Sequence, residues 1–301
     1  MQSDGEYGQI RCSFAQREPA YLKMANPNAA FLELGPQDGL FFEYDAPVGF
    51  NPTLVFVNAL TGNTDAWQAA VAPRCRRAGL GTLCWNFRGQ AYSPFSKHLD
   101  LNADVIIGDL VALLKRVNPP RPIPVGLSIG GLYASRAILA GAPATGLVLL
   151  NTLRRIGPRI AWINDALLAA VRVGGFPLLL DLYLPLLTNE VFQAENRSKY
   201  LIASSYAPQD PSHGLFKLME AAGSTDWDVP YERLKLPVLT ITGLQDRLFL
   251  DHDEVGRLRL KLPQAKHLEW PDAGHLLPME HPLRLADTLI EFAKGLNGHV
   301  D

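Results

Sequence analysis

A serine sits at the centre of a glycine-rich hexapeptide, where a short apolar run gives way to a helical pattern. The hexapeptide reads Gly126-Leu-Ser-Ile-Gly130-Gly131, which places Ser128 between glycines. A serine hydroxyl is a poor nucleophile unless it is exposed and paired with a base. A tight strand-to-helix turn exposes the hydroxyl, and the helix start directs N–H groups toward it. The pattern predicts Ser128 as a nucleophile; the alternative is a glycine-rich turn with an idle serine.

A base for this serine is sought among the seven histidines of the chain. His275 lies in Asp272-Ala-Gly-His-Leu-Leu-Pro, a loop that directly follows the last expected strand. That position is at the carboxyl edge of the sheet, the same edge as Ser128. The other histidines lie in helical, strand-like or terminal segments without that placement. His275 is therefore the predicted base, and the alternative is an ordinary solvated loop histidine.

A carboxylate is needed to orient the imidazole of His275. Asp246 follows an expected strand in Gly243-Leu-Gln-Asp-Arg, and a loop at that position can turn the carboxylate toward Nδ1. Asp272 is the rival, since it lies three residues before the histidine. We favour Asp246, because Asp272 is expected to shape the histidine loop itself.

Strand and helix patterns alternate along most of the chain and predict the elements that position these residues. Strands are expected at 29–34, 40–44, 53–57, 82–87, 124–127, 146–150, 237–242 and 267–270. Helices are expected at 65–78, 103–117, 129–139, 254–261 and 282–296, the first of them with Thr64 as N-cap and Gly79 as its stop. Such alternation implies crossover connections, a mostly parallel sheet and functional groups at the carboxyl ends of its strands.

The alternation stops between about residues 151 and 227, where the chain is helical by pattern and rich in leucine. Within it, residues 161–173 form one amphipathic segment. We interpret 151–227 as an inserted helical cap, 1–150 as the N-terminal part of the core domain and 228–301 as its C-terminal part. No element is assigned to residues 1–25.

These features together resemble the α/β-hydrolase family, in its capped serine-hydrolase branch, over about residues 29–296. The order Ser128, Asp246, His275 matches the family's order of nucleophile, acid and base. The segment Asn86-Phe-Arg-Gly-Gln-Ala-Tyr-Ser is similar to the family's Asp-x-Arg-Gly-x-Gly-x-Ser, with Asn86 and Ala91 as departures. The resemblance implies an α/β-hydrolase fold, in which helices flank a mostly parallel central sheet and a helical cap is inserted.

The resemblance also implies an oxyanion hole made of two backbone N–H groups. Ile129, directly after the nucleophile, supplies one donor, and Leu60 in Asn58-Ala-Leu60-Thr-Gly62 supplies the other. The family usually has His-Gly-x in this loop, so Asn58 is a departure. Asn58 either braces the loop, as a histidine would, or only caps the end of the strand, and both interpretations stay open.

A serine nucleophile implies acyl chemistry, whereas family members that form alkyl esters use aspartate in its place. We expect hydrolysis of a carboxylic ester of a small to medium, largely apolar substrate through an acyl-enzyme intermediate. The alternatives are a carbon–carbon bond hydrolase of a β-diketone or ring-fission product, an acyltransferase, and a small-molecule receptor without enzymatic activity.

The expected cap offers candidate substrate contacts. Its residues 176–187 are apolar enough to face an acyl chain or aromatic ring, and Trp162 and Tyr183 are the predicted substrate-binding aromatics. The alternative for most of the leucines is ordinary packing. Arg154, Arg155 and Arg159 either meet an acidic substrate or are solvated charges, and the second interpretation is favoured.

Composition excludes several other functions. The 301 residues are 48% hydrophobic and carry a net charge of −2, which offers nucleic acid no basic surface. Three cysteines show no metal-ligand spacing, and no cofactor-binding pattern is present, so neither metal nor cofactor is expected. The stretch 176–187 is too short for a membrane span and contains Pro177, Asp181 and Pro185. The polar, acidic start is unlike a signal peptide, so we expect a cytoplasmic location, and the oligomeric state is not predicted.

Overall fold

The computed structural model describes residues 28–152, 155–202 and 205–296, and within them eight strands form a single sheet. The strand order is β1-β2-β4-β3-β5-β6-β7-β8, in which β1 pairs with β2 and β2 with β4 antiparallel, and every other pairing is parallel. This confirms the predicted mostly parallel sheet. The bounds are β1 Ala29–Gly35, β2 Asp38–Asp45, β3 Thr53–Val57, β4 Gly81–Trp85, β5 Pro122–Leu127, β6 Leu147–Leu150, β7 Val238–Gly243 and β8 Lys266–Trp270.

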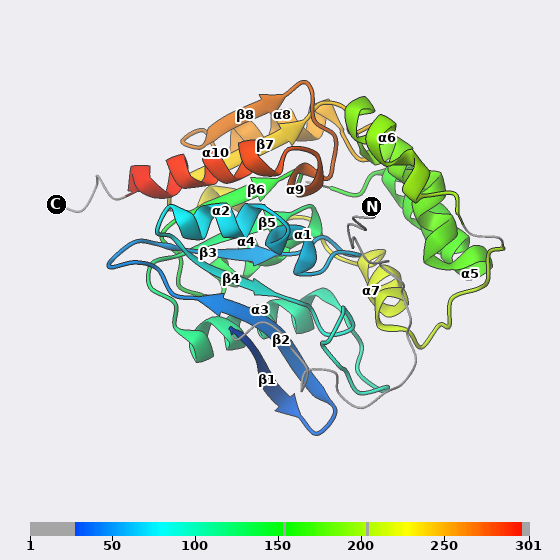
Figure 1. The fold of residues 1–301 in the computed structure, drawn as a ribbon, viewed down its shortest axis with the longest axis horizontal. Helices are drawn as coiled ribbons and strands as arrows, with labels where there is room; N and C mark the ends of the chain where they lie inside the picture. The colour runs from blue at the N-terminus through cyan, green and yellow to red at the C-terminus, as the bar shows by residue number, and fades with distance from the viewer. Residues whose placement is uncertain (1–27, 153–154, 203–204, 297–301) are drawn as a thin grey trace, which may run out of the picture.

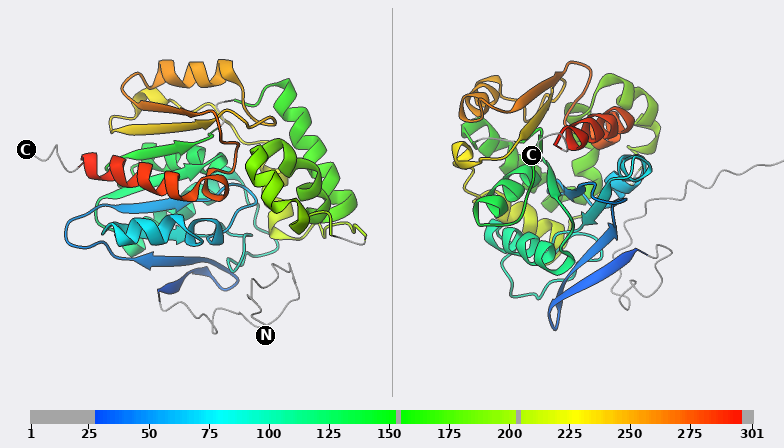
Figure 2. Two further views of the ribbon diagram at one scale, coloured as in Figure 1. Left: turned by 45° about the horizontal axis from the view of Figure 1, so that its top comes forward. Right: turned by 90° about the vertical axis from the view of Figure 1, so that its left-hand side faces the viewer.

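Helices cover both faces of this sheet, as Figures 1 and 2 show. Helices α3, α4 and α8 contribute to the core of one face, and α2, α9 and α10 to the core of the other. Their bounds are α1 Asp65–Gln68, α2 Val71–Arg77, α3 Ala103–Val117, α4 Ile129–Leu139, α8 His252–Lys261, α9 Leu277–Glu280 and α10 Pro282–Gly295.

Strand β3 lies between β4 and β5 and is buried on both sides. Because successive side chains of a strand point to opposite faces, Val55 and Val57 enter one core while Leu54 and Phe56 enter the other. Burial on both faces explains why the sequence of this strand is a continuous apolar run. It also marks the point where successive connections leave the sheet in opposite directions, which is where open α/β sheets bind ligands.

The prediction of one continuous helix at 65–78 is wrong, because the structure has two short helices there. The break falls at Ala70, whose φ of −153° is not helical. Pro73 explains it: inside a continuous helix this proline would lack the N–H that bonds one turn back, whereas in the first turn of α2 no such bond is needed. Gly79, with φ of +86°, follows α2 as expected.

A helical segment connects β6 to β7 and contains α5 (Pro158–Leu187), α6 (Glu190–Asn196), η2 (Arg197–Lys199) and α7 (Gly214–Ala222). In Figure 1 it lies beside the sheet. Helix α5 bends at Gly175, whose φ is +69°, and it packs on α7 through Val171, Phe176 and Leu179. A 3-10 turn, η3 (Tyr231–Arg233), precedes β7.

Helix α5 is longer than the sequence predicted. Among the described residues it is the one helix long and apolar enough to cross a membrane, judged by length and composition. The non-helical Gly175 divides this helix, so residues 176–187 form only its second part, and the expectation that they do not span a membrane stays a prediction. Pro177 is accommodated because the kink at Gly175 places it in the first turn of the second part of the helix, where its missing N–H would have no partner.

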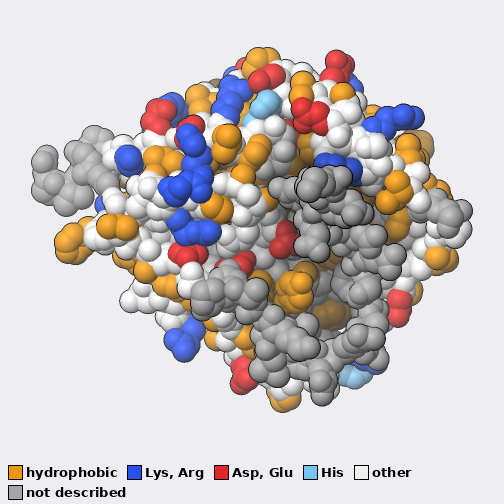
Figure 3. Space-filling view, in the orientation of Figure 1, with side chains coloured by type: hydrophobic (Ala, Val, Ile, Leu, Met, Phe, Trp, Pro, Cys, Tyr) orange, Lys and Arg blue, Asp and Glu red, His pale blue; other side chains and the backbone are white. Residues whose placement is uncertain are grey.

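Charged side chains of both signs are interspersed on the face shown in Figure 3. This distribution agrees with the small net charge of the chain, −2. Among the described residues, no group of three or more His, Cys, Asp or Glu side chains is placed to hold a metal ion. The expectations about nucleic acid and location stay predictions.

Two cysteines of the core provide a test of its packing. Cys75 and Cys84 are buried free thiols, and burial raises the pKa of Cys75 to about 12 and that of Cys84 well above its usual value. Both thiols are therefore neutral and inaccessible at about pH 8. In a Cys12→Ser variant, which removes the cysteine outside the described residues, we expect no reaction with an aromatic disulfide reagent until denaturant is added. Rapid reaction of the native protein would contradict this core.

Candidate active site

Ser128 occupies a strained turn between β5 and α4. Its φ of 56° and ψ of −123° are rare for a residue with a side chain. The backbone N–H of Ser128 donates to Leu150 O of β6 at 2.8 Å, and its carbonyl accepts the Gly131 N–H at 3.0 Å. The turn is thus bonded to both the sheet and the helix, and it leaves the partly exposed serine at the edge of a pocket.

Glycine is required beside this serine because backbone segments meet there. A Cβ at Gly130 would lie 2.4 Å from Val57 O and 2.5 Å from Asn58 O. A Cβ at Gly126 would lie 2.4 Å from the Cα of Gly131. The start of α4 therefore packs directly on the end of β3, which brings Ile129 next to the loop that contains Leu60.

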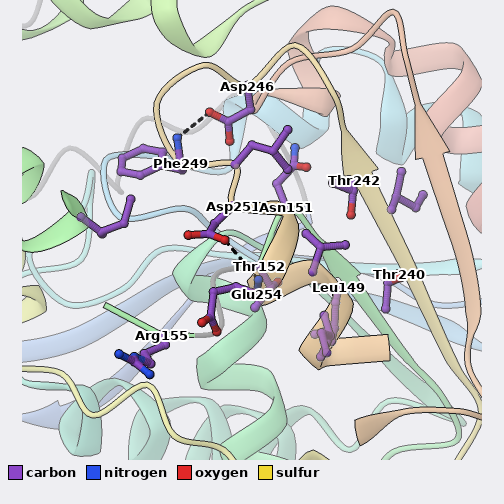
Figure 4. Close-up of a pocket in the computed structure, with 15 residues that line it drawn as sticks. Leu149, Asn151, Thr152, Arg155, Thr240, Thr242, Asp246, Phe249, Asp251 and Glu254 are labelled. Atoms are coloured by element: carbon purple, nitrogen blue, oxygen red, sulfur yellow. Dashed lines mark hydrogen bonds between the residues drawn. The ribbon is translucent and has the colours of Figure 1, made fainter. Parts of the chain in front are cut away.

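His275 and Asp246 come from the loops after β8 and β7, and the structure brings them together. His275 Nδ1 lies 2.6 Å from Asp246 Oδ2, and the two side chains are 5% and 4% exposed. The second oxygen, Oδ1, accepts the N–H groups of Leu248 at 3.1 Å and Phe249 at 2.8 Å. Figure 4 shows Asp246 with the bond to Phe249. These bonds hold the carboxylate in one orientation toward the imidazole.

The rival carboxylate, Asp272, has a different partner. Its side chain is 59% exposed and forms an ion pair with Arg284 at 2.8 Å. Its backbone carbonyl accepts the Nδ2 donor of Asn189. Asp272 therefore helps to shape the histidine loop, as expected. Asp246 is the carboxylate bonded to His275.

Two polar residues with no predicted role hold the histidine loop. Asn151, directly after β6, donates through Nδ2 to Gly274 O at 3.0 Å and His275 O at 2.9 Å. Its Oδ1 accepts the Gly243 N–H at 2.7 Å. This one side chain therefore joins the ends of β6 and β7 to the loop that carries the imidazole.

Glu280 is the second of these residues. Its carboxylate accepts the N–H groups of Gly274 and Leu276, on either side of His275, each at 2.8 Å, and that of Asn189 at 2.7 Å. Burial raises the pKa of Glu280, while the three N–H donors act in the opposite direction. Nothing local in the sequence indicates which backbone groups Glu280 binds.

The loop after β3 is held by buried amide side chains. Asn58, 1% exposed, donates through Nδ2 to Trp85 O at 2.9 Å and to Asn86 Oδ1 at 3.1 Å. Its Oδ1 accepts the Trp67 indole N–H at 2.8 Å. Of the two interpretations left open by the sequence, the structure therefore supports bracing of the loop by Asn58.

Both predicted oxyanion donors face the same region. Leu60 and Ile129 line the pocket that Ser128 and His275 also line. Ile129 is the first residue of α4, and the first N–H of a helix has no partner within it. In the described part of the chain, no backbone or side-chain acceptor is bonded to the Leu60 N–H. Both N–H groups are thus available to a ligand.

The pocket has a volume of about 140 Å³ and is mostly apolar. Side chains of α5 and α7 form much of its wall, among them Leu167, Leu179, Tyr183, Leu187 and Met219. Tyr183 lines this pocket, and its role in binding substrate stays a prediction. The prediction for Trp162 is wrong: the side chain is 79% exposed and lies outside the pocket lining. Side chains two positions apart in a helix point in directions that differ by about 200°. Asn164 therefore lines the pocket, whereas Trp162 does not.

Arg155 and Arg159 do not line this pocket. Arg159 donates to the backbone carbonyls of Leu248 and Leu250, at 3.0 and 2.9 Å, and so braces the loop after Asp246. Arg155 lines a second cavity of about 40 Å³, which Asp246 and Asn151 also line (Figure 4). That volume is sufficient for a water molecule. Arg154 lies outside the described residues.

The model of the alpha/beta hydrolase fold family matches residues 52–282. The chain is 26% identical to 3-oxoadipate enol-lactonase 2 of Acinetobacter baylyi over 234 residues, which cover 77% of this chain and 84% of that protein.

Solved structures give the same fold. An esterase from Exiguobacterium antarcticum has a TM-score of 0.72 at 15% identity, with 88% of this chain and 99% of that chain covered. An enol-lactonase from Burkholderia xenovorans has a TM-score of 0.70 at 21% identity, with 90% and 100% covered. At these identities the likeness establishes a shared fold.

Proposed function

Because the chain belongs to the alpha/beta hydrolase fold family, we propose that it is a serine hydrolase of small, largely apolar carboxylic esters, cyclic esters included. One observation carries the proposal. Ser128 and His275 line the same pocket, and Nδ1 of His275 is bonded to the buried carboxylate of Asp246. This arrangement supplies a nucleophile, a base and an orienting anion, the three groups that acyl transfer from an ester requires.

In the proposed mechanism Ser128 Oγ attacks the ester carbonyl carbon, and His275 Nε2 accepts the hydroxyl proton. Asp246 keeps the other ring proton on Nδ1 and stabilises the imidazolium that forms. The N–H groups of Leu60 and Ile129 bind the oxyanion. The imidazolium then protonates the leaving alkoxide, which departs as an alcohol and leaves the acyl group on Ser128.

The second half repeats these steps with water. His275 removes a proton from a water molecule, the hydroxide attacks the acyl carbon, and the proton returns to Ser128 Oγ as the carboxylic acid is released. A cyclic ester passes through the same steps, except that its alcohol stays covalently joined to the acyl group, so hydrolysis of the acyl-enzyme releases a single hydroxy acid.

The pocket supports a small substrate. Its volume of about 140 Å³ is close to that of an engineered apolar protein cavity of roughly 150 Å³ that binds benzene. An acyl group or ring of similar size therefore fits between the wall formed by α5 and α7 and the loops that carry Leu60, Ser128 and His275. The relatives include an enol-lactonase and an esterase, which is the reason for including cyclic esters in the proposed substrate class.

We further propose that residues 151–227 act as a cap on this pocket. The end of α5 is bonded to both loops that carry the acid and the base: Leu186 O accepts the Arg247 N–H at 2.8 Å, and Leu187 O accepts the His275 N–H at 2.6 Å. The segment that forms the pocket wall is thus attached to the proposed machinery.

Labelling by a fluorophosphonate tests the proposed function. We expect one phosphonylated residue, Ser128, when the modified protein is digested and sequenced by mass spectrometry, because phosphonylation requires an activated serine. A His275→Ala variant should label far more slowly, since its serine lacks a base.

The exposed Ser224 provides a control, because Ser224→Ala should label like the wild type. Heat-denatured protein should not label at all. Modification confined to a serine other than Ser128, or no modification of the native protein, would contradict the proposal.

A further inference from the structure

The side chain of Gln90 contacts the loop that contains Leu60. It is 3% exposed. Its Nε2 donates to Ala59 O at 2.9 Å and to Leu60 O at 3.1 Å. Its Oε1 accepts the Asn58 Nδ2 donor at 2.9 Å and the Phe87 N–H at 3.0 Å. All four hydrogen-bonding positions of the carboxamide are therefore used.

These bonds determine which way the Leu60 N–H points. The peptide between Ala59 and Leu60 is trans, so its C=O and N–H point in opposite directions. The C=O is directed at Gln90 and also accepts the Gly62 N–H at 3.0 Å. The N–H consequently points away from Gln90, and Ala59, Leu60 and Thr61 line the pocket on that side.

We propose that Gln90 is a positioning residue that aims the Leu60 N–H at the developing oxyanion. The inference rests on the proposed hydrolase mechanism, in which that N–H binds charge that forms only in the transition state. Gln90 itself touches no substrate, and it acts through the peptide that it orients.

The consequence of losing Gln90 follows from its two acceptors. Without it, the carbonyls of Ala59 and Leu60 lose a donor in a buried place, which is unfavourable. Rotation of the peptide toward the pocket gives the carbonyl of Ala59 access to water. That rotation replaces the N–H donor by a carbonyl oxygen, which repels an oxyanion.

The test uses Gln90→Met, which keeps the length of the side chain but has no donor, with 4-nitrophenyl acetate as substrate. We expect kcat to fall by about 10²- to 10³-fold, the effect of removing one oxyanion donor. KM should change by less than about threefold, because the ground-state ester carbonyl depends little on this N–H.

Ser93→Ala is the matched control. Ser93 is also 3% exposed, lies in the same turn, and accepts the Phe41 N–H while donating to Asn86 O. It has no bond to Ala59 or Leu60, so this variant should lower the melting temperature and leave kcat near the wild-type value. Equal falls of kcat in both variants would show a general structural effect and overturn the inference.

Gln90→Glu keeps the test decisive if the methionine variant fails to fold. A neutral glutamic acid has one O–H donor and a carboxylate has none. The ratio of its kcat to that of the wild type should therefore rise as the pH falls from about 8 to about 6. A ratio near one that is independent of pH overturns the inference. Failure of the proposed function is distinguishable, because then the wild type itself neither labels at Ser128 nor turns over the ester.

Discussion

Replacement of Ser128 by alanine is expected to lower kcat by about 10⁶-fold, the loss seen when the nucleophile of a serine enzyme is removed. In the proposed mechanism this residue supplies the atom that becomes acylated, and no other serine lines the pocket within the described residues. Affinity for a product carboxylate, measured by calorimetry, should stay within a few-fold of the wild type. Steady-state rates with 4-nitrophenyl acetate, corrected for the uncatalysed reaction, give the measurement.

Ser128→Gly separates catalysis from folding at the same position. The φ of 56° and ψ of −123° strain any residue with a Cβ, by about 1–3 kcal/mol, and the Ser128 side chain makes no helix-capping bond that the change would remove. The glycine variant should therefore be inactive yet more stable than Ser128→Ala in denaturant unfolding. Retained turnover in either variant would contradict the mechanism, and a glycine variant less stable than the alanine one would contradict the strained turn.

The elements nearest the serine could be predicted from sequence because their signals are local. Helices at 103–117 and 129–139 have the predicted bounds. The convergence of the loops follows from strand order. Val57 pairs with Gly126, Leu127 with Leu150, and Gly243 with Trp270, so the residues after β3, β5, β7 and β8 reach one edge together.

Prediction from the sequence fails where a local pattern competes with a constraint from a distant part of the chain. The period of residues 65–78 is helical throughout, but Pro73 moves the helix start to residue 71. Trp162 has the right residue type for a substrate contact, yet the rotation of α5 about its axis is decided by packing on α7. Neither the rotation nor the kink at Gly175 has a unique signal in the sequence.

The supporting residues of the candidate site were missed for a related reason. Gln90 lies 31 positions from Ala59, and Asn151 lies 124 positions from His275, so each bond depends on the completed sheet. Glutamine and asparagine at these places are ordinary loop residues by composition. Only the fold shows that their amides orient the peptides and the loop on which the proposed chemistry depends.

Asp246→Asn is expected to lower kcat by about 10⁴-fold, as the equivalent change does in serine proteases. The amide keeps the shape of the side chain, and its oxygen can still accept the N–H groups of Leu248 and Phe249. The atom 2.6 Å from His275 Nδ1 then becomes an NH₂ donor. A donor at that place favours the imidazole tautomer with its proton on Nε2, which cannot accept the proton of Ser128.

The control for this change is Asp272→Asn, which alters the other aspartate of the region. Asp272 is 59% exposed and paired with Arg284, and an exposed ion pair contributes at most about 1 kcal/mol to stability. Its kcat with 4-nitrophenyl acetate should therefore match the wild type across the pH profile. The reverse pattern, a large loss for Asp272→Asn and a small one for Asp246→Asn, would assign the orienting role to Asp272. That outcome would require Asp272 to leave Arg284 and turn toward the imidazole, which would displace the bond that His275 makes with Asp246 in this structure.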